Sequence, residues 1–241
     1  MQSLKTGAEA LRIPLTSEHL TALRKYQEAL QTWNEQFNLT AITDDEGIQI
    51  RHFLDSLSCL LALEAGERFS GQRIIDVGSG AGFPGLPLKL LCPGIRLTLI
   101  EATAKKVTFL EHIIDQLGLD DVIARHERAE TLGQDPRHRA RYDWALARAV
   151  ADLPILVEYL LPLVKIGGRV LAQKGEDAPA EVQRADWAIR HLGGRVRKLV
   201  PVHLHGLAET RHLVLIDKVA ATPEKYPRRP GIPAKRPLTA P

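Results

Sequence analysis

From residue 73 onward, short aliphatic runs alternate with segments long enough to form helices. The runs have the length and composition of buried strands, and each is followed by a helix-length segment. The predicted strands cover residues 74–77, 97–100, 122–124, 144–147 and 170–172, and the predicted helices cover residues 86–91, 105–117, 153–164 and 180–192. This alternation predicts a parallel sheet with helices on both faces.

Two further aliphatic runs, residues 196–202 and 213–219, follow without a helix between them. They are expected to pair as an antiparallel hairpin at the end of the sheet. A dinucleotide-binding Rossmann domain would instead insert another helix before its sixth strand. The chain is therefore predicted to be an α/β protein with a seven-stranded, mostly parallel, Rossmann-like sheet, the arrangement typical of class I methyltransferases.

The first 64 residues have a different, helical pattern. Residues 16–37 repeat apolar side chains at three-, four- and seven-residue steps, and Thr16 or Ser17 can cap the start of that helix. A second helix is expected over residues 45–63. Residues 64–72 contain two glycines and form a plausible hinge. We therefore predict a helical extension over residues 1–64, a main domain over residues 65–220 and a tail over residues 221–241.

The tail holds most of the net positive charge. Of the formal charge of +3, the segment from Val219 onward contributes +4, because it has five basic residues and only one acid, Glu224. Its prolines, among them Pro223, Pro227, Pro230, Pro233 and Pro237, favour an extended rather than helical chain. Such a tail suits an anionic partner, nucleic acid before membrane, although a solubilising overhang explains the charge equally well.

Several classes of protein are disfavoured by composition. No apolar run approaches the roughly 20 residues of a membrane span, and Met1 to Leu15 lack the pattern of a signal peptide. The two cysteines, Cys59 and Cys92, have neither metal-like spacing nor a disulfide framework. The expected setting is the reducing cytoplasm, with no bound metal and no membrane partner.

A glycine-rich loop follows the first predicted strand. The strand over residues 74–77 runs into Gly78, Gly80 and Gly82, and Pro84 opens the next helix. Glycine lets the backbone adopt positive φ and leaves room for a ligand against the main chain. The helix N-terminus offers free N–H groups to an anion, which in a methyl donor is the methionine carboxylate.

Two other interpretations of this loop are open. Residues 80–85 also match G-x-G-x-x-G, the dinucleotide signature. In that signature the first glycine closes the strand, whereas here Gly78 closes it, two residues too early. Counted from Asp76, the loop is acidic-x-G-x-G-x-G, which resembles the loop of methyltransferases. A glycine turn with no ligand is the remaining possibility.

Polar residues end the later strands at the same predicted edge. Glu101 ends the second strand, where a carboxylate accepts hydrogen bonds from both ribose hydroxyls of a nucleoside, and Ala102 and Thr103 follow it. The third strand leads to Ala129 and Glu130, where an acid or amide usually faces adenine. The ends of the fourth and fifth strands carry two cations, Arg148 and Lys174. Each of these polar residues could instead be an ordinary surface group.

Across almost its whole length, the chain resembles the bacterial small-subunit ribosomal RNA guanine-N7 methyltransferase family (RsmG, also called GidB). The most specific motifs are the Phe83-Pro84-Gly85 continuation of the glycine loop and the Tyr226-Pro227-Arg228 start of the tail. The other similar segments are Trp33-Asn34, residues 38–40, Arg51 to Ser56, Ala147 to Ala151, and Gln173 to Gly175.

The resemblance implies methyl transfer from S-adenosyl-L-methionine to N7 of one guanine, position 527, in 16S ribosomal RNA. The partner would be that RNA or an assembling small ribosomal subunit. The resemblance and the strand ends imply a set of cofactor-binding residues, namely Gly78, Phe83, Glu101, Ala102, Thr103, Ala129, Glu130 and Arg148. The glycine loop adds Gly80 to this set. Phe83 departs from the aliphatic residue that also occurs at this position. Arg148, Lys174, Arg228 and Arg229 are the expected RNA contacts.

The expected chemistry needs no dedicated catalytic base. Guanine N7 carries a free lone pair, so positioning is sufficient. The sequence after the fourth strand, Arg148 to Ala151, does not match the Asp/Asn-Pro-Pro-aromatic element of amino methyltransferases. Neither Cys59 nor Cys92 is placed as a nucleophile. The alternatives are a non-catalytic RNA-binding or ribosome-assembly module and an NAD-dependent oxidoreductase, although no His, Tyr or Lys pair is placed for hydride transfer.

Overall fold

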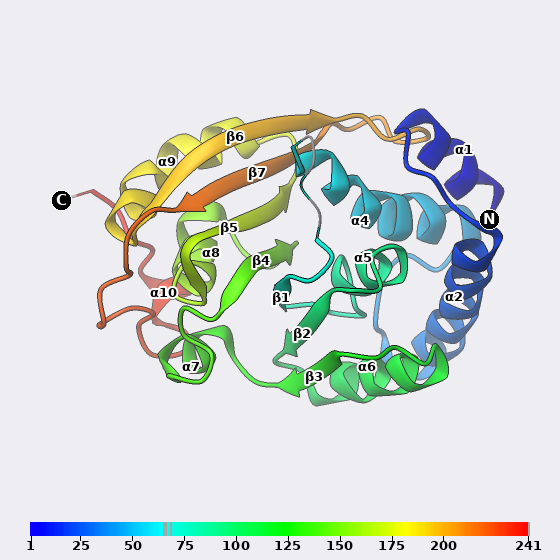
Figure 1. Ribbon diagram of the computed structural model, residues 1–241, viewed down its shortest axis with the longest axis horizontal. Coiled ribbons are helices and arrows are strands. Elements are labelled where there is room, and N and C mark those ends of the chain that lie inside the picture. The colour runs from blue at the N-terminus through cyan, green and yellow to red at the C-terminus, as the bar shows by residue number, and fades with distance from the viewer. Residues whose placement is uncertain (65–66, 68, 241) are drawn as a thin grey trace.

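A seven-stranded sheet forms the centre of the computed structural model, which describes residues 1–64, 67 and 69–240 (Figure 1). The strands are β1 (Arg73–Val77), β2 (Arg96–Glu101), β3 (Val122–His126), β4 (Tyr142–Arg148), β5 (Val164–Lys174), β6 (Gly194–Val202) and β7 (Arg211–Lys218). Their order is β3-β2-β1-β4-β5-β7-β6, and β7 is antiparallel to both neighbours. The predicted Rossmann-like sheet with a closing hairpin is confirmed.

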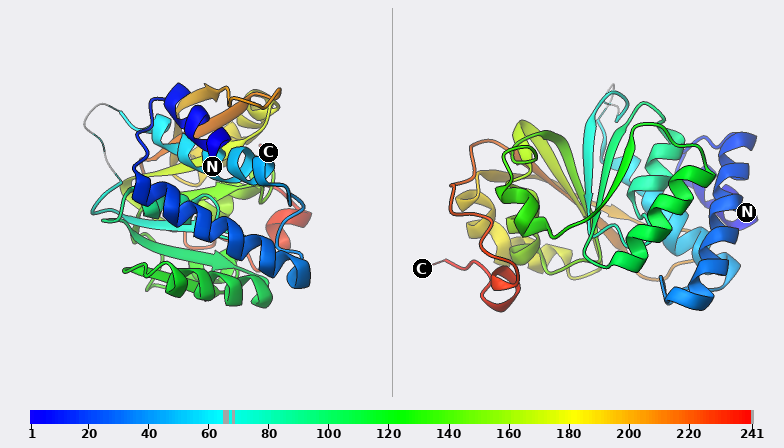
Figure 2. Two further views of the ribbon diagram at one scale, coloured as in Figure 1. Left: turned by 90° about the vertical axis from the view of Figure 1, so that its right-hand side faces the viewer. Right: turned by 90° about the horizontal axis from the view of Figure 1, so that it is seen from below.

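Helices cover both faces of this sheet (Figure 2). The N-terminal region contains α1 (Gln2–Ala10), α2 (Ser17–Phe37), α3 (Asp45–Gly47), the π-helix η1 (Ile48–Leu54), α4 (Asp55–Leu57) and the 3-10 helix η2 (Ser58–Ala62). The others are α5 (Gly85–Leu91), α6 (Ala104–Gln116), α7 (Ala129–Gln134), α8 (Leu153–Leu160), α9 (Ala178–His191) and α10 (Ile232–Lys235). The predicted helices over 16–37 and 45–63 are both present. The sequence pattern missed α1, α7 and α10, which are short.

Each face of the sheet has its own hydrophobic core. On one face, α5, α6 and the N-terminal helices bury residues such as Leu23, Leu86 and Phe109. On the other face, α7, α8 and α9 bury residues such as Leu132 and Ile189. The N-terminal extension therefore shares its core with the sheet. The expected boundary between residues 64 and 65 falls where the described residues stop, so the division into three segments stays a prediction.

The start and end of α2 have local causes. The Thr16 hydroxyl accepts a hydrogen bond from the His19 backbone N–H at 3.2 Å, and the His19 side chain accepts one from the Thr16 N–H at 3.2 Å. This reciprocal capping satisfies backbone donors that a helix N-terminus leaves free. At the other end, Asn38 takes a left-handed conformation with φ of 50°, which ends the helix.

The expectation of an extended, free tail is wrong. Residues Ile232–Lys235 form α10, because Gly231 takes a φ of +81° and Pro233 lies in the first helical turn, where proline is tolerated. Arg139 donates hydrogen bonds to the tail carbonyls of Thr222 and Tyr226 at 2.9 and 2.6 Å. The tail is therefore packed on α7 and α8 rather than held away from the body.

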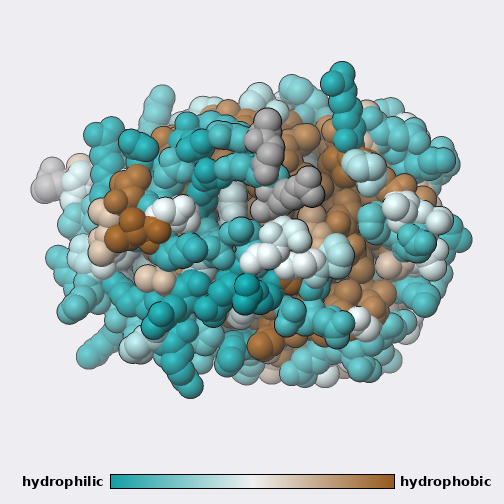
Figure 3. Space-filling model, viewed as in Figure 1, coloured by the Kyte–Doolittle hydropathy of each residue, from teal (hydrophilic) through white to brown (hydrophobic). Residues whose placement is uncertain are grey.

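Hydrophilic side chains cover much of the face seen in Figure 3, and hydrophobic atoms show mainly in the half where α4 and α5 lie. None of the helices in the described ranges is both long and apolar enough to cross a membrane. Within those ranges, no three His, Cys, Asp or Glu side chains are grouped so that they could hold a metal ion.

Candidate active site

The glycine loop after β1 is folded as its sequence requires. Gly78, Gly80 and Gly82 have φ values of +68°, +59° and +100°, a region that side-chain-bearing residues rarely adopt. A Cβ on Gly78 would lie 2.7 Å from Val150, so this glycine is needed for packing. A Cβ on Gly80 would meet no atom within 4 Å. The main chain at Gly80 is therefore open toward space that a ligand can fill.

Asp76 fixes the start of the helix that follows the loop. Its buried carboxylate accepts a hydrogen bond from the Gly85 N–H at 2.8 Å, and the other oxygen, Oδ1, has no partner among the described residues. Burial raises the pKa of Asp76 to about 7, although the Gly85 N–H and Arg148 act in the opposite direction. Asp76 is thus a structural link between β1 and α5 that titrates near neutral pH.

Glu101 joins the glycine loop to the segment after β2. Its carboxylate accepts hydrogen bonds from the Gly80 N–H at 3.0 Å and the Thr103 N–H at 2.9 Å. A carboxylate has about four lone-pair positions, so two remain for hydroxyl donors. The side chain is nearly buried, which strengthens such hydrogen bonds. This geometry suits the ribose contact expected for Glu101.

Arg148, at the end of β4, is held by the helical segment that contains η1 and α4. Its guanidinium donates to Asp55 Oδ2 at 2.9 Å, to the Arg51 carbonyl at 2.8 Å and to His52 Nδ1 at 3.2 Å. Its Cζ also lies 5.1 Å from the centre of the Phe83 ring. The sequence predicted Arg148 at this edge. It did not indicate that three neighbouring residues of another segment would fix it.

His52 is neutral in this arrangement. Arginine has only donors, so Nδ1 of His52 accepts from Arg148 and the proton lies on Nε2. Nε2 is 2.8 Å from the Thr40 hydroxyl, to which it donates. Burial and the Arg148 charge lower the pKa of His52 to about 3. Both ring nitrogens are therefore occupied, and His52 is not available as a base.

Aromatic stacking holds the loop against the N-terminal helices. The Phe83 ring stacks on His52 and on Tyr26, with centroids 4.5 and 5.3 Å apart and planes within 12° and 10°. The Tyr26 hydroxyl donates to the Ala81 carbonyl. The strand-end and glycine patterns of the sequence give no site role to Tyr26, His52 or Asp55. The available signal was the run of polar residues inside an otherwise apolar helix, at His52, Asp55 and Ser56.

These residues enclose a cavity of about 380 Å³ at the carboxyl ends of β1, β2 and β4. It is lined by Leu39, Thr40, His52, Gly78, Ser79, Gly80, Ala81, Phe83, Glu101, Ala102, Lys106, Arg148, Ala149 and Val150. Open α/β sheets bind ligands at this edge, and the volume suits a small molecule. The structure thus brings together six predicted cofactor residues, Gly78, Gly80, Phe83, Glu101, Ala102 and Arg148.

Other predicted site residues lie elsewhere. Thr103 contacts Glu101 through its backbone, whereas Ala129 and Glu130 are not among the residues that line the cavity. Glu130 accepts a hydrogen bond from the Gly231 N–H of the tail at 2.9 Å. Lys174 does not line this cavity but lines a neighbouring one, where it pairs with Glu181 at 2.6 Å and donates to the Ala151 carbonyl at 2.6 Å. The structure gives these polar side chains intramolecular partners.

The two expected RNA contacts of the tail differ from each other. Arg228 pairs with Glu158, a completely buried carboxylate, at 2.6 Å. A buried carboxylate needs such a partner, which assigns Arg228 to the packing of the tail. Arg229, the next residue, is exposed. Of the two, Arg229 is the more exposed, whereas the Arg228 side chain is 25% exposed and has an ion-pair partner.

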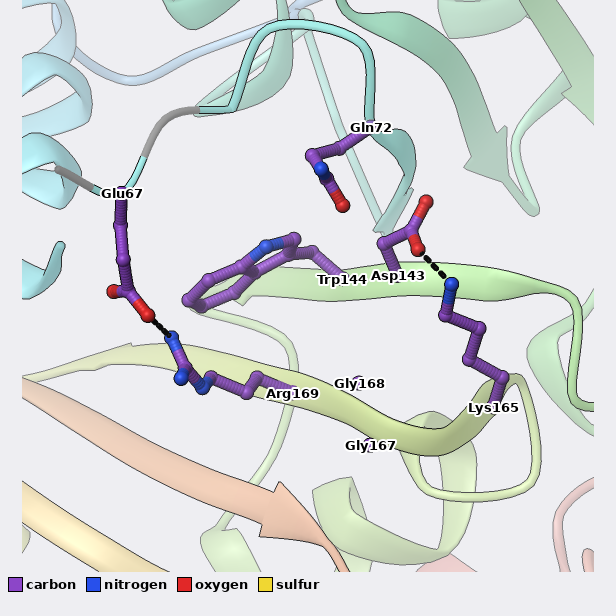
Figure 4. Close-up of a pocket in the computed structure, with 8 residues that line it drawn as sticks. All are labelled: Glu67, Gln72, Asp143, Trp144, Lys165, Gly167, Gly168 and Arg169. Carbon is purple, nitrogen blue, oxygen red and sulfur yellow. Dashed lines mark hydrogen bonds and ion pairs between the residues drawn. The ribbon is translucent and has the colours of Figure 1, made fainter.

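A cavity at the opposite edge of the sheet is less suited to a ligand (Figure 4). It lies at the amino ends of β4 and β5 and has a volume of about 390 Å³. Its charged side chains pair with each other, Glu67 with Arg169 at 2.5 Å and Asp143 with Lys165. It contains no glycine loop and lies away from the edge where such sheets carry out chemistry. We therefore assign the active site to the carboxyl edge.

Comparison with known proteins identifies the family. The family model described as "rRNA small subunit methyltransferase G" matches residues 19–214. The chain belongs to this family. A "Ribosomal RNA small subunit methyltransferase G" from Roseiflexus sp. (strain RS-1) is 51% identical over 238 residues, which cover 99% of this chain and 100% of the relative. One of the same name from Alkaliphilus metalliredigens is 45% identical over 98% of this chain and 97% of the relative.

Solved structures agree on the fold. A SAM-dependent methyltransferase from Aquifex aeolicus has a TM-score of 0.53 at 17% identity, over 72% of this chain and 93% of that chain. A geranyl diphosphate methyltransferase in complex with SAM has a TM-score of 0.53 at 14% identity, over 68% and 85%. Membership of the family makes the protein a methyltransferase, an enzyme, rather than the oxidoreductase or the non-catalytic module considered above.

A substitution of Glu101 tests its predicted role. Glu101→Ala is expected to weaken the binding of S-adenosylhomocysteine by about 1–3 kcal/mol, because charged hydrogen bonds are lost inside a nearly buried site. Isothermal calorimetry measures the effect. Glu111→Ala, which changes an exposed glutamate on α6, is the matched control. Unchanged affinity in Glu101→Ala would show that this carboxylate does not contact the ligand.

Proposed function

We propose that this methyltransferase transfers the methyl group of S-adenosyl-L-methionine to N7 of guanine 527 in 16S ribosomal RNA. The observation that carries the proposal is the cavity at the carboxyl edge, where the open side of Gly80 faces the same space as Glu101 and Arg148. Membership of the ribosomal RNA methyltransferase family supports the RNA substrate. The site of action is the cytoplasm, on free 16S RNA or on an assembling small subunit.

The residues present fit this cofactor. A ligand can lie against the main chain at Gly80 because no atom occupies the direction of its missing Cβ. Glu101 retains lone pairs for ribose hydroxyls, and Ala102 lines the same cavity. When bound there, S-adenosyl-L-methionine supplies an electrophilic methyl group on a sulfonium sulfur. The glycine loop, Glu101 and Arg148 would hold it at the edge of the sheet.

The protein contributes positioning rather than proton transfer. Guanine N7 has a free lone pair, so methylation requires no base. The arrangement of the site agrees with this requirement. Both nitrogens of His52 are hydrogen-bonded, and Asp76 is completely buried behind the loop. His52 and Asp55 instead fix Arg148, and Tyr26 and Phe83 hold the glycine loop in place.

The reaction product can be tested directly. Purified protein is incubated with S-adenosyl-L-methionine and 16S RNA, or small-subunit particles, from a strain that lacks this modification. Cleavage chemistry specific for 7-methylguanine, followed by primer extension, is expected to give one new stop at position 527. Calorimetry is expected to show binding of S-adenosylhomocysteine and none of NAD. A methylated base without a 7-methylguanine stop would contradict the proposal.

The pH dependence of the chemical step provides another prediction. Since His52 has a pKa of about 3 and stays neutral, the single-turnover rate at saturating substrates is expected to show no general-base limb near neutrality. The group that can affect the profile is Asp76, whose pKa of about 7 lets it ionise within this range. The side chain of Asp76→Asn cannot titrate, so this variant separates the ionisation of Asp76 from the action of a general base. A bell-shaped profile that persists in Asp76→Asn would indicate a catalytic base and argue against N7 methylation.

A further inference from the structure

A second cavity adjoins the one assigned to the cofactor. Its volume is about 380 Å³, and it shares His52, Arg148 and Ala149 with the first cavity. Beyond these shared residues it is lined by Asp55 and Gln173, among others, neither of which lines the first cavity. The strands β4 and β5 end beside α4 at this place (Figure 1). The shared residues thus mark the border between two neighbouring cavities.

Two residues that line the second cavity each carry a buried oxygen acceptor without a hydrogen-bond partner among the described residues. Asp55 and Gln173 are each 6% exposed, and Asp55 Oδ1 and Gln173 Oε1 have no partner among the described residues. The second polar atom of each side chain is fixed. Asp55 Oδ2 accepts from Arg148 at 2.9 Å, and Gln173 Nε2 donates to the Asp55 carbonyl at 2.7 Å. Since that carbonyl only accepts, the amide orientation of Gln173 is determined.

Unpartnered buried acceptors are costly, so an occupant that donates hydrogen bonds would relieve them. Guanine has such donors side by side, N1–H and the exocyclic N2 amino group. Its N7 lies at the opposite end of the base. A guanine that directs its donors at Asp55 and Gln173 has N7 at its far end, and the reaction requires that end to lie at the border with the cofactor cavity.

We propose that the second cavity receives the target guanine, and that Asp55 and Gln173 select it by accepting hydrogen bonds from N1–H and the N2 amino group. This inference rests on the proposed function of the adjoining cavity. The base must leave the RNA stack to enter. Arg51 and Arg211 also line the cavity, and neither has an ion-pair partner in the described part of the chain. Their guanidinium groups can meet the phosphates of the flipped nucleotide.

The border residues are compatible with attack by N7. An arginine that donated to guanine N7 and O6, as in common protein–nucleic acid contacts, would occupy the reacting lone pair. Arg148 donates instead to Asp55, His52 and the Arg51 carbonyl. These hydrogen bonds hold its guanidinium in place. Asp55 Oδ2 fixes Arg148, and Asp55 Oδ1 remains without a partner among the described residues.

The test combines a change in the RNA with a change in the protein. Inosine lacks the N2 amino group but keeps N7, so it can still be methylated. We expect 16S RNA with inosine at the target position to accept labelled methyl from S-adenosyl-L-methionine with kcat/KM at least about tenfold lower than normal RNA. In Gln173→Met or Asp55→Asn, the ratio between the two RNAs is expected to fall toward one. Such coupling is not produced by a general loss of structure.

Binding of S-adenosylhomocysteine provides the control for folding. Gln173→Met is expected to bind it as the parent protein does, because Gln173 lies outside the first cavity. If both variants keep the full inosine effect, or the parent protein shows none, the assignment of the guanine pocket is overturned. If the parent protein forms no 7-methylguanine on normal RNA, the proposed function itself fails. The two failures are therefore distinguishable.

Discussion

Gly80→Val is expected to lose all measurable binding of S-adenosylhomocysteine while the protein stays folded. The branched side chain would project into the empty space beside the main chain, where the ligand must lie. Gly118→Val is a matched control, since both glycines have a φ of +59° and a Cβ at either position would meet no atom within 4 Å. The two variants should suffer similar backbone strain, of order 1–3 kcal/mol.

Calorimetry of both variants measures the obstruction of ligand binding, and thermal unfolding measures the backbone strain. Gly118 lies after α6 and outside the residues that line the cofactor cavity, so Gly118→Val should bind the ligand normally. Normal ligand binding by Gly80→Val would mean that the cofactor does not pass this glycine. The assignment of the first cavity would then be wrong.

Arg228→Ala is expected to destabilise the fold strongly. It leaves the completely buried carboxylate of Glu158 without its cation, and loss of one partner of a buried pair typically costs about 3–5 kcal/mol. For a chain of this size, Tm falls by roughly 2–4 °C for each kcal/mol. Arg229→Ala, at the exposed neighbouring position, should change stability by less than about 0.5 kcal/mol.

Thermal unfolding of both variants, with a double variant as a third arm, checks this role. Glu158→Leu combined with Arg228→Met removes both charges and should recover much of the lost stability. If Arg228→Ala unfolds at the parent temperature, the pair does not hold the tail. The RNA contact predicted for the tail is tested with Arg229→Ala, which leaves the Glu158–Arg228 pair intact and should reduce the salt slope of RNA binding by about one unit.

Local sequence patterns predicted the fold class and one wall of the active site. Strand–helix alternation can be predicted because it follows from the spacing of apolar side chains. Positive φ at Gly78 and Gly80 can be predicted because glycine adopts it readily. Glu101 and Arg148 could be placed because the carboxyl ends of parallel strands meet at one edge of a sheet. Each of these features depends on short stretches of chain, and the structure has them in the predicted places.

The opposite wall of the site depends on contacts between distant segments. Asp55 and Arg148 are 93 residues apart, and Gln173 is 118 residues from the carbonyl that fixes it. No local pattern predicts which helix will pack beside the end of β4, so His52 and Asp55 were not recognised as site residues. The π-helix η1, which carries His52, is likewise a feature that the apolar spacing of the sequence does not predict.

The tail shows most clearly the difference between what local sequence predicts and what tertiary contacts decide. Its prolines and positive charge are properties of the sequence, and they are the basis on which the tail is predicted as a separate segment. Which of its charges pairs inside the protein was decided by Glu158 on α8, 70 residues away, whose burial requires Arg228 as a partner. The other four basic residues of the tail are exposed. Sequence determined the sheet, the glycine loop and the composition of the tail. Tertiary structure decided which charged groups are free to meet a ligand, because burial creates the need for an internal partner.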